Sequence, residues 1–583
     1  MFKGLNIEQQ NAVTASGHVL LTACPGSGKT RVLTYRVAYE LERLRHKKIV
    51  AALTFTNRAS DEIKRRVDRL DMDSGRLWAG TIHAFCLEWI LYPYCSYLEQ
   101  LRDGFVIADE FMMEEMLSEV KFELGYRRNQ RLSTRISPDG SLFEPDLTLH
   151  HVIEEYRKRL AEKKMIDFDQ MLFLSYKLLS KFPRIAATLN ALFQLICVDE
   201  YQDTQELQYR ILSKIINVDP SRTTIFFVGD SDQAIYGSLG GVAKSIEDIK
   251  FIFNGLAIQE LKLSGNYRST QRSIDYYRNF QSANIDIKSK CDYQDLQGVI
   301  SFEDTVLRDD LAERIAEIIQ INIDNGVPER EVCVLGPQWW MIIPMGRKLK
   351  ALLPDIEFDA VGLSPLTRNR ENIWFKFARL FLVDPAPNMY FVRSRWATEL
   401  LSELDIIGLQ LMADIEHRSK RFLRTFNSIS STEEQGLEYL QDCFTQFMIL
   451  LNINIEHYPL LKLHWNSFFD GTRKKLAEKD FQTASDVKGF KRMFRHNQGV
   501  VVNTCHGIKG EEFHTVICFG LLDGFIPNAG EIDQDLAGNK LLYVICSRAK
   551  RHLHLFSEQG HWNNRETTPQ LDAVNFNYDN KNW

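Results

Sequence analysis

The sequence predicts an α/β fold with parallel sheets, and three features predict it. Apolar runs of the length of buried strands recur at 19–22, 49–55, 195–198 and 225–228. Segments with helical spacing of apolar residues follow the first two runs. The last two runs end in carboxylates, at Asp199 and Asp230. Strands that alternate with helices and end in functional residues are typical of a nucleotide-binding α/β protein.

The first run leads into Ala23-Cys24-Pro25-Gly26-Ser27-Gly28-Lys29-Thr30, the arrangement of a phosphate-binding loop between a strand and a helix. Gly26 and Gly28 let the backbone turn tightly and aim its N–H groups at phosphate oxygens. Lys29 is expected to reach the β- and γ-phosphates, and Thr30 to bind Mg²⁺. Ala23 stands where the usual pattern has its first glycine, so a glycine-rich turn that binds nothing is the alternative.

Two carboxylates at the end of the 195–198 run are expected to serve a hydrolytic reaction. Asp199 would hold Mg²⁺ through its water shell, and Glu200 would orient and deprotonate the attacking water. An Asp-Glu pair alone is usually only a strand end, but after a phosphate-binding loop it indicates a nucleotide hydrolase. Gln233, just past the next run, is placed to sense the γ-phosphate.

Further side chains are candidates to contact a base or a phosphoryl group. The amide of Gln9 can pair with adenine, and Tyr267 can stack on it. Arg268 can neutralise charge on the transferring phosphoryl group. Phe55 is either a core residue or a stacking surface for a nucleic-acid base. A lone histidine such as His83 is more often structural than catalytic.

The composition limits the classes of function. The chain has 583 residues, 44% of them hydrophobic and 25% charged, which predicts a soluble globular protein of roughly three or four domains. Its ten cysteines form no Cys-x-x-Cys pair, so we expect reduced thiols in a cytoplasmic protein, without a signal peptide, zinc site or transmembrane helix. The net charge of −6 does not indicate nucleic-acid binding. Local basic clusters are either solvated faces or contacts to a phosphate backbone: Arg127, Arg128, Arg131, Arg135, Arg473, Lys474, Lys475, Lys488, Lys491, Arg492 and Arg495.

Taken in order, these motifs resemble the UvrD/Rep/PcrA group of superfamily 1 DNA helicases, including the short form found in Gabija-type systems. The resemblance extends over most of the chain through the motifs at 54–57, 80–83, 167–169, 199–204, 229–237, 266–270, 503–513 and 542–549. It implies two RecA-like parallel-sheet domains with ATP between them, each with a mostly helical insertion. The expected boundaries are 1–88 and 195–265 for the first domain, 89–194 for its insertion, 266–378 and 496–583 for the second domain, and 379–495 for its insertion.

The resemblance also implies roles for individual residues. The expected catalytic residues are Lys29, Asp199, Glu200, Gln233, Arg268 and Arg548, the two arginines acting as fingers from the second domain. The expected ATP-binding residues are Gln9, Ala23, Gly26, Ser27, Gly28, Lys29, Thr30, Arg36, Tyr267 and Glu512, with Thr30 and Asp199 serving Mg²⁺. The expected DNA track consists of Phe55, Asn57, Thr81, His83, Tyr236, Thr504 and His506.

The implied function is an ATP-dependent 3′–5′ helicase or translocase on single-stranded and tailed duplex DNA, in DNA repair or replication restart. The chain departs from the family at Ser238 and Leu239, where a Trp-Arg pair is usual, and the missing ring removes roughly 1–3 kcal/mol of strand binding. The lead into the last motif, at 537–540, is also changed. Three alternatives stay open: a helicase-like ATPase subunit of a nuclease-containing phage-defence complex such as Gabija, a catalytically silent nucleotide-binding scaffold, and RNA as the track.

Overall fold

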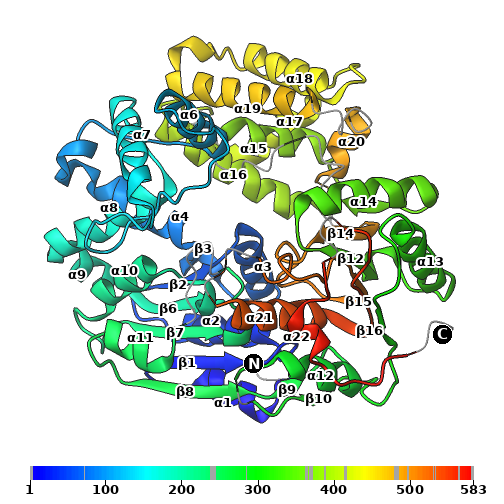
Figure 1. Ribbon diagram of the computed structural model, residues 1–583. Helices are drawn as coiled ribbons and strands as arrows, with labels where there is room; N and C mark the ends of the chain where they lie inside the picture. The colour runs from blue at the N-terminus through cyan, green and yellow to red at the C-terminus, as the bar shows by residue number, and fades with distance from the viewer. Residues whose placement is uncertain are drawn as a thin grey trace.

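The fold is α/β, as the sequence predicts, and is built on two sheets of parallel strands. The computed structural model describes residues 4–70, 72–236, 244–283, 285–360, 366, 372–386, 389–412, 417–477, 485–494, 498–528, 531, 533–561 and 565–579. The two sheets lie side by side in the lower half of Figure 1, and most of the helices of residues 110–192 and 373–492 lie above them.

The first sheet has the order β3-β2-β6-β7-β1-β8, with all neighbours parallel. Its strands are β1 (His18–Ala23), β2 (Ile49–Thr54), β3 (Leu77–Thr81), β6 (Phe193–Asp199), β7 (Thr224–Gly229) and β8 (Ile258–Leu263). Successive residues of the inner strands enter two different cores: Leu20 and Ile196 pack on one face, and Val19 and Leu195 on the other. Strands buried on both faces explain the unbroken apolar runs in the sequence.

The second sheet has the order β11-β16-β15-β12-β14-β13, and its strands are also parallel. They are β11 (Ile300–Glu303), β12 (Val332–Gly336), β13 (Phe358–Ala360), β14 (Val500–Thr504), β15 (Phe513–Cys518) and β16 (Ala549–Phe556). Two further parallel pairs join β4 (Val106–Ile107) to β5 (Met165–Ile166) and β9 (Gly265–Asn266) to β10 (Lys288–Ser289).

Helices cover both faces of each sheet and form the upper half of the molecule (Figure 1). Those of the first 265 residues are α1 (Ile7–Thr14), α2 (Lys29–Glu42), α3 (Asn57–Asp68), α4 (Ile82–Cys86), α5 (Tyr92–Tyr94), α6 (Glu110–Glu123), α7 (His150–Glu162), α8 (Phe168–Lys181), α9 (Pro183–Leu192), α10 (Glu206–Ile216) and α11 (Ile246–Ile252). The later helices are α12 (Gln271–Tyr277), α13 (Leu311–Asp324), α14 (Trp339–Leu352), α15 (Ile373–Leu382), α16 (Tyr390–Ile406), α17 (Arg418–Ser428), α18 (Gly436–Leu450), α19 (Pro459–Ala477), α20 (Val487–Arg492), α21 (Gln534–Cys546) and α22 (Pro569–Asp572).

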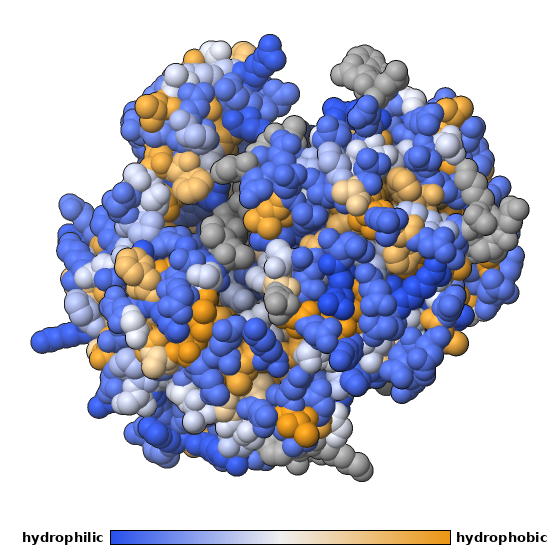
Figure 2. Space-filling view, turned by 60° about the horizontal axis from the view of Figure 1, so that its bottom comes forward, coloured by the Kyte–Doolittle hydropathy of each residue, from blue (hydrophilic) through white to orange (hydrophobic). Residues whose placement is uncertain are grey.

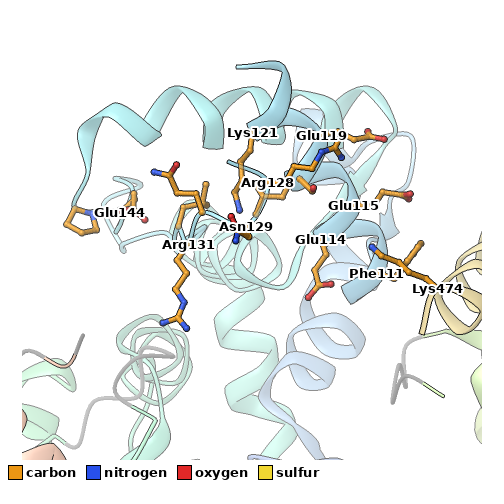
Figure 3. A pocket seen from close by; sticks show the side chains of 15 residues that line it. Phe111, Glu114, Glu115, Glu119, Lys121, Arg128, Asn129, Arg131, Glu144 and Lys474 are labelled. Atoms are coloured by element: carbon orange, nitrogen blue, oxygen red, sulfur yellow. The ribbon is translucent and has the colours of Figure 1, made fainter. Parts of the chain in front are cut away.

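The two helical regions above the sheets touch each other. Asp109, the buried N-cap of α6, accepts hydrogen bonds from Ser467 Oγ (2.6 Å) and Asn372 Nδ2 (3.4 Å). Nearby, the Lys474 ammonium lies 5.8 Å from the ring centre of Phe111. Beside this contact is a cavity of about 930 Å³ whose lining mixes carboxylates with lysine and arginine side chains (Figure 3).

No membrane-spanning helix is found among the described residues. None of the described helices is both long enough and apolar enough to cross a bilayer. On the face seen in Figure 2, hydrophobic residues form small groups among hydrophilic ones.

Candidate nucleotide and nucleic-acid site

The predicted phosphate-binding loop joins the carboxyl end of β1 to the first turn of α2. Gly26 and Gly28 have φ angles of 69° and 82°, in the left-handed region that glycine adopts without strain, and Gly28 is the N-cap of α2. Lys29 and Thr30 therefore form the first turn of the helix, where free N–H groups and the helix dipole favour an anion. Ser27 Oγ donates to the carbonyl oxygen of Cys24 at 2.7 Å and closes the loop.

The loop lies against the segment that begins at β9. The backbone N–H of Tyr267 donates to the carbonyl oxygen of Gly26 at 2.9 Å. A Cβ atom at Gly26 would lie 2.6 Å from Cβ of Arg268 and 2.7 Å from Oδ1 of Asn266. The absence of a side chain at Gly26 thus permits the close approach of the loop to residues 266–268.

Gln9 and Tyr267, the two predicted adenine contacts, are linked through Asn6. Gln9 is buried, its Nε2 donates to the carbonyl oxygen of Ser27 (2.9 Å), and its Oε1 accepts from the backbone N–H of Asn6 (3.0 Å). Asn6 Nδ2 in turn donates to the hydroxyl of Tyr267 (2.8 Å), whose side chain is 44% exposed. Asn6 is the N-cap of α1, and the sequence analysis did not single it out.

Arg36, predicted beside the base, is buried within the helical layer. Its guanidinium donates to the carbonyl oxygens of Val13 (2.9 Å) and Ala15 and forms an ion pair with Glu40 (2.9 Å). These contacts brace α2 against the end of α1. A contact between Arg36 and adenine stays a prediction. It would require Arg36 to give up some of these contacts and to bind the base instead.

The two predicted catalytic carboxylates stand at the end of β6. Glu200 has a left-handed backbone (φ 52°) and accepts a hydrogen bond from Gln202 Nε2. Burial, together with the charge of Glu200, raises the pKa of Asp199. Burial also acts to raise the pKa of Glu200, but Lys29 and Lys509 outweigh it and leave that pKa lowered. Glu200 is therefore the carboxylate that the site keeps ionised, as a general base requires.

The donor set at this edge of the sheet suits Mg²⁺. A hydroxyl at Thr30 and a carboxylate at Asp199 are the hard oxygen ligands that this cation prefers. The carboxylates of Asp199 and Glu200 are neighbours, and Lys29 is a nearby cation. A divalent ion would offset the negative charge that Lys29 leaves unbalanced. Thr30 and Asp199 are the residues that would hold it.

Two arginines, one after β9 and one before β16, face this edge. Arg548 is buried and donates from NH2 to Gln233 Oε1 at 2.6 Å, while Gln233 Nε2 donates to Asp230 Oδ2 at 2.7 Å. Burial lowers the pKa of Arg548 to about 10, so it remains a cation at neutral pH. Arg268 pairs with Glu512 (Nε–Oε2, 2.6 Å) and donates to the carbonyl oxygen of Ser547 (3.0 Å).

Lys509 forms a second connection between the two sheets, which the sequence analysis did not predict. Its ammonium pairs with Asp203 Oδ2 at 2.6 Å, and both side chains are buried. The same ammonium donates to the carbonyl oxygen of Gln233 and lies 5.1 Å from the ring centre of Tyr236. Burial raises the pKa of Asp203 to about 6, although Lys509 acts to lower it.

The predicted track residues gather beyond the carboxyl ends of β2, β3 and β14. The rings of Phe55 and Tyr236 stack, with centroids 4.8 Å apart and planes 18° from parallel. The hydroxyl of Tyr236 donates to the carbonyl oxygen of His506 at 3.0 Å, so it reaches from the first sheet to the second. Thr504 ends β14, and its Oγ1 accepts from the N–H of Gly507.

The remaining track residues lie on the other side of Phe55. Thr81 caps α4 by accepting from the N–H of Ala84 (3.2 Å), and the ring of His83 meets Phe168 edge-on at 5.7 Å. Burial lowers the pKa of His83 to about 4, which keeps it neutral. The side chain of Asn57 and residues 237–243, including Ser238 and Leu239, lie outside the described part of the structure.

A cavity of about 420 Å³ connects the two groups of residues. Its lining includes Asp199 and Glu200 from the hydrolytic side and Phe55, His83 and Tyr236 from the track side. Residues predicted for hydrolysis and residues predicted for the strand thus line the same cavity.

Comparison with known proteins agrees with this arrangement. Residues 5–253 match the UvrD/REP helicase N-terminal domain. The chain is 32% identical over 301 residues to the ATP-dependent DNA helicase UvrD1 of Mycobacterium tuberculosis, a match that covers 47% of this chain and 38% of that protein. It is 32% identical over 300 residues to the ATP-dependent DNA helicase PcrA of Bacillus subtilis (47% and 39%), and 29% over 356 residues to PcrA of Staphylococcus epidermidis (58% and 48%). The chain thus matches less than half the length of these relatives. In its ordered motifs and its matched domain, the chain is similar to the UvrD/Rep/PcrA helicases.

Proposed function

We propose that this protein is an ATP-hydrolysing DNA helicase or translocase that moves 3′ to 5′ on single-stranded DNA. The observation that carries the proposal is the convergence of a phosphate-binding loop and two carboxylates from the first sheet with two arginines, one that follows β9 and one that precedes β16. The names of the relatives support the class of activity. The direction of movement and a role in DNA repair or replication restart come from the resemblance.

The residues of the proposed ATP site have different roles in hydrolysis. Lys29 and the loop N–H groups hold the β- and γ-phosphates, and Glu200 takes a proton from the attacking water. Arg268 and Arg548 neutralise charge that develops on the transferring phosphoryl group. Mg²⁺, when bound by Thr30 and Asp199, supplies further neutralisation of phosphate charge.

Gln233 and Lys509 are the proposed connection between hydrolysis and movement. Gln233 holds Arg548 with its side chain and Lys509 with its carbonyl oxygen. Lys509 in turn lies over Tyr236, which stacks on Phe55. A change of charge at the γ-phosphate thus reaches the stacking residues through two contacts, that of Gln233 with Lys509 and that of Lys509 with Tyr236. Closing and opening of the interface then moves one sheet relative to the other.

In this proposal, the motor consists of a RecA-like domain of residues 1–88 and 195–265 and a second of residues 266–378 and 496–583. Residues 89–194 and 379–495 are their helical insertions. These insertions lie above the sheets and contact each other through Asp109 and Ser467. The boundaries themselves stay predictions.

A strand-separation assay tests the proposal. Purified protein, ATP and Mg²⁺ are mixed with a labelled duplex that carries a single-stranded tail at either its 3′ or its 5′ end. Release of the labelled strand from the 3′-tailed duplex alone is the expected result. Release from the 5′-tailed duplex alone contradicts the polarity, and ATP hydrolysis without release from either contradicts unwinding by the chain alone.

A second candidate is a helicase-like ATPase subunit of a nuclease-containing phage-defence complex. Ser238 and Leu239 in place of the usual Trp-Arg favour it, because a weaker hold on the strand suits a motor that works with a partner. Purifying the chain alone and together with the products of neighbouring genes separates the two. Processive unwinding by the chain alone counts against this candidate.

The third alternative, a silent nucleotide-binding scaffold, is disfavoured by the intact charged set. Lys29 and Lys509 favour the ionised form of Glu200, and Gln233 orients Arg548, which binding alone does not require.

A further inference from the structure

Aromatic rings extend along the carboxyl edge of the second sheet beyond the predicted track. In that sheet β14, β12 and β15 are neighbours. His506 follows β14, Trp339 and Trp340 follow β12, and Phe525 follows β15. Because parallel strands end at the same edge, these rings form a row that continues from Tyr236, whose hydroxyl bonds to His506.

The position of the tryptophan pair relative to the track is set by the backbone. Gly336, the last residue of β12, pairs with Thr504, the last residue of β14. The N–H of Cys505 donates to the carbonyl oxygen of Gly336 at 3.0 Å. The start of α14 at Trp339 is therefore adjacent to the segment that carries Thr504 and His506, and Figure 1 shows α14 at the top of this sheet.

Trp339 and Trp340 are the exposed tryptophans of the described residues, at 46% and 50%. Trp340 is held in place, since its Nε1 donates to Gln338 Oε1 at 2.6 Å and its ring meets Phe525 edge-on at 5.6 Å. Phe525 is supported in turn by the guanidinium of Arg565, 4.4 Å from its ring centre. Among the described residues, Trp339 has no hydrogen-bond or ring partner. Two large rings, of which that of Trp340 is held in place, thus leave area uncovered at the surface.

We propose that Trp339 and Trp340 form a stacking platform for bases of single-stranded DNA where the strand crosses the second sheet. The inference rests on the proposed function and extends it. The platform takes the place of the tryptophan ring that is usual in the family at the position of Ser238. It moves part of the strand binding from the first sheet to the second.

Bases fit this surface better than a protein partner does. Base stacking uses the flat face of an indole and needs no pocket, whereas a protein interface surrounds its buried tryptophans with a larger apolar patch. The pair also follows a strand, β12, whose last residue pairs with Thr504, a residue already expected to line the DNA strand.

The test measures binding of a fluorescein-labelled oligodeoxythymidine by fluorescence anisotropy, without nucleotide. The variants are Trp339→Ala, Trp340→Ala and the corresponding phenylalanine replacements. Phe251→Ala is the matched control, because Phe251 is an aromatic residue 77% exposed on α11, away from the row. Phe55→Ala reports on the predicted track. Circular dichroism shows whether each variant folds.

Each alanine variant is expected to bind the oligonucleotide roughly 5- to 150-fold more weakly, the equivalent of one lost stack. The phenylalanine variants keep most of the affinity, and oligonucleotide binding quenches their tryptophan fluorescence less than that of the wild type. Phe251→Ala binds like the wild type.

Two results overturn the platform. If Phe55→Ala weakens binding and both tryptophan→alanine variants bind like the wild type, the track stands and the pair does not belong to it, which leaves a protein contact as its use. If the wild type itself does not bind the oligonucleotide, the proposed function fails and the platform fails with it.

Discussion

At the scale of single residues, the site separates two adjacent carboxylates by their surroundings. Asp199 is buried and Glu200 is half-buried, but only Glu200 has a lowered pKa, because the charges of Lys29 and Lys509 favour its ionised form. Its left-handed backbone and the bond from Gln202 orient the side chain away from the direction of the strand. Strain at such a position is typical of functional sites.

Replacing Glu200 by Gln therefore separates binding from chemistry. The amide keeps the shape of the side chain but cannot take a proton, so we expect kcat for ATP hydrolysis to fall by about 10²- to 10⁴-fold. Binding of a fluorescent ATP analogue should remain within a few-fold of wild type. Turnover by the variant at the wild-type rate would show that another group is the base.

A second prediction concerns Gly26. An alanine there would clash with Arg268 and Asn266, in addition to the cost of about 1–2 kcal/mol for a left-handed backbone. We expect Gly26→Ala to lose ATP hydrolysis because residues 266–268 can no longer approach the loop.

Gly17 provides the matched control for Gly26. It also has a positive φ, of 75°, but a Cβ there would meet no atom within 4 Å. Gly17→Ala should lower the melting temperature and leave ATP hydrolysis near the wild-type rate. Equal hydrolysis by the two variants would argue against the contact between the loop and residues 266–268.

At the scale of elements, neutral buried histidines help to hold the upper helices. His464 of α19 accepts a hydrogen bond at Nδ1 from the N–H of Ile373, the first residue of α15 (3.2 Å). Its carbonyl oxygen accepts from Asn372, the N-cap of α15 (2.8 Å). Burial lowers the pKa of His464 to about 4, so the ring stays an acceptor at neutral pH.

Acid should therefore weaken the contact between α15 and α19. Between about pH 6.5 and 4 the unfolded chain binds a proton at His464 that the folded chain excludes, so the free energy of unfolding falls as the pH falls. We expect His464→Asn to lose less of its melting temperature than wild type when the pH is lowered from about 7 to about 5. His457→Asn, at an exposed histidine, should show the wild-type pH dependence. The same acid sensitivity in all three proteins would contradict this account.

The sequence predicts some of these elements and not others, for physical reasons. Buried strands such as β1, β6 and β7 are continuous apolar runs and can be recognised. The edge strand β8 exposes Gln259 and Glu260, and β16 begins with Ala-Lys-Arg-His, so neither is visible as an apolar run.

Site residues within motifs could be proposed from the sequence, but contacts across the chain could not. Asn6 meets Tyr267 over 261 positions, and Lys509 meets Asp203 over 306. No local pattern reports which of many charged or polar residues will become neighbours at such separations. The stacking of Phe55 directly on Tyr236 is a further contact of this kind.

At the scale of the whole molecule, the two sheets are joined by a small number of buried polar contacts. Lys509 pairs with Asp203, and Arg548 with Gln233, across the interface. Such contacts are costly to bury, and the loss of one partner leaves the other buried without its counterpart.

Lys509→Met tests this connection. The variant leaves Asp203 buried without its cation, and we expect the free energy of unfolding to fall by about 3–5 kcal/mol. Stimulation of ATP hydrolysis by DNA should fall further than the unstimulated rate, because the contact with Tyr236 is lost. Lys250→Met, which removes an exposed helical pair with Glu247, should cost less than about 1 kcal/mol and leave the stimulation intact. Normal stimulation in Lys509→Met would place the coupling elsewhere.

The central claim is that one interface both hydrolyses ATP and responds to a strand on the track. It is tested most directly by measuring ATP hydrolysis by wild type, Lys29→Ala and Phe55→Ala, each with and without single-stranded DNA. The account predicts that DNA strongly stimulates hydrolysis by the wild type and that Lys29→Ala does not hydrolyse ATP. Phe55→Ala should hydrolyse ATP at the unstimulated rate, with or without DNA. Hydrolysis by the wild type that stays the same with and without DNA would contradict it.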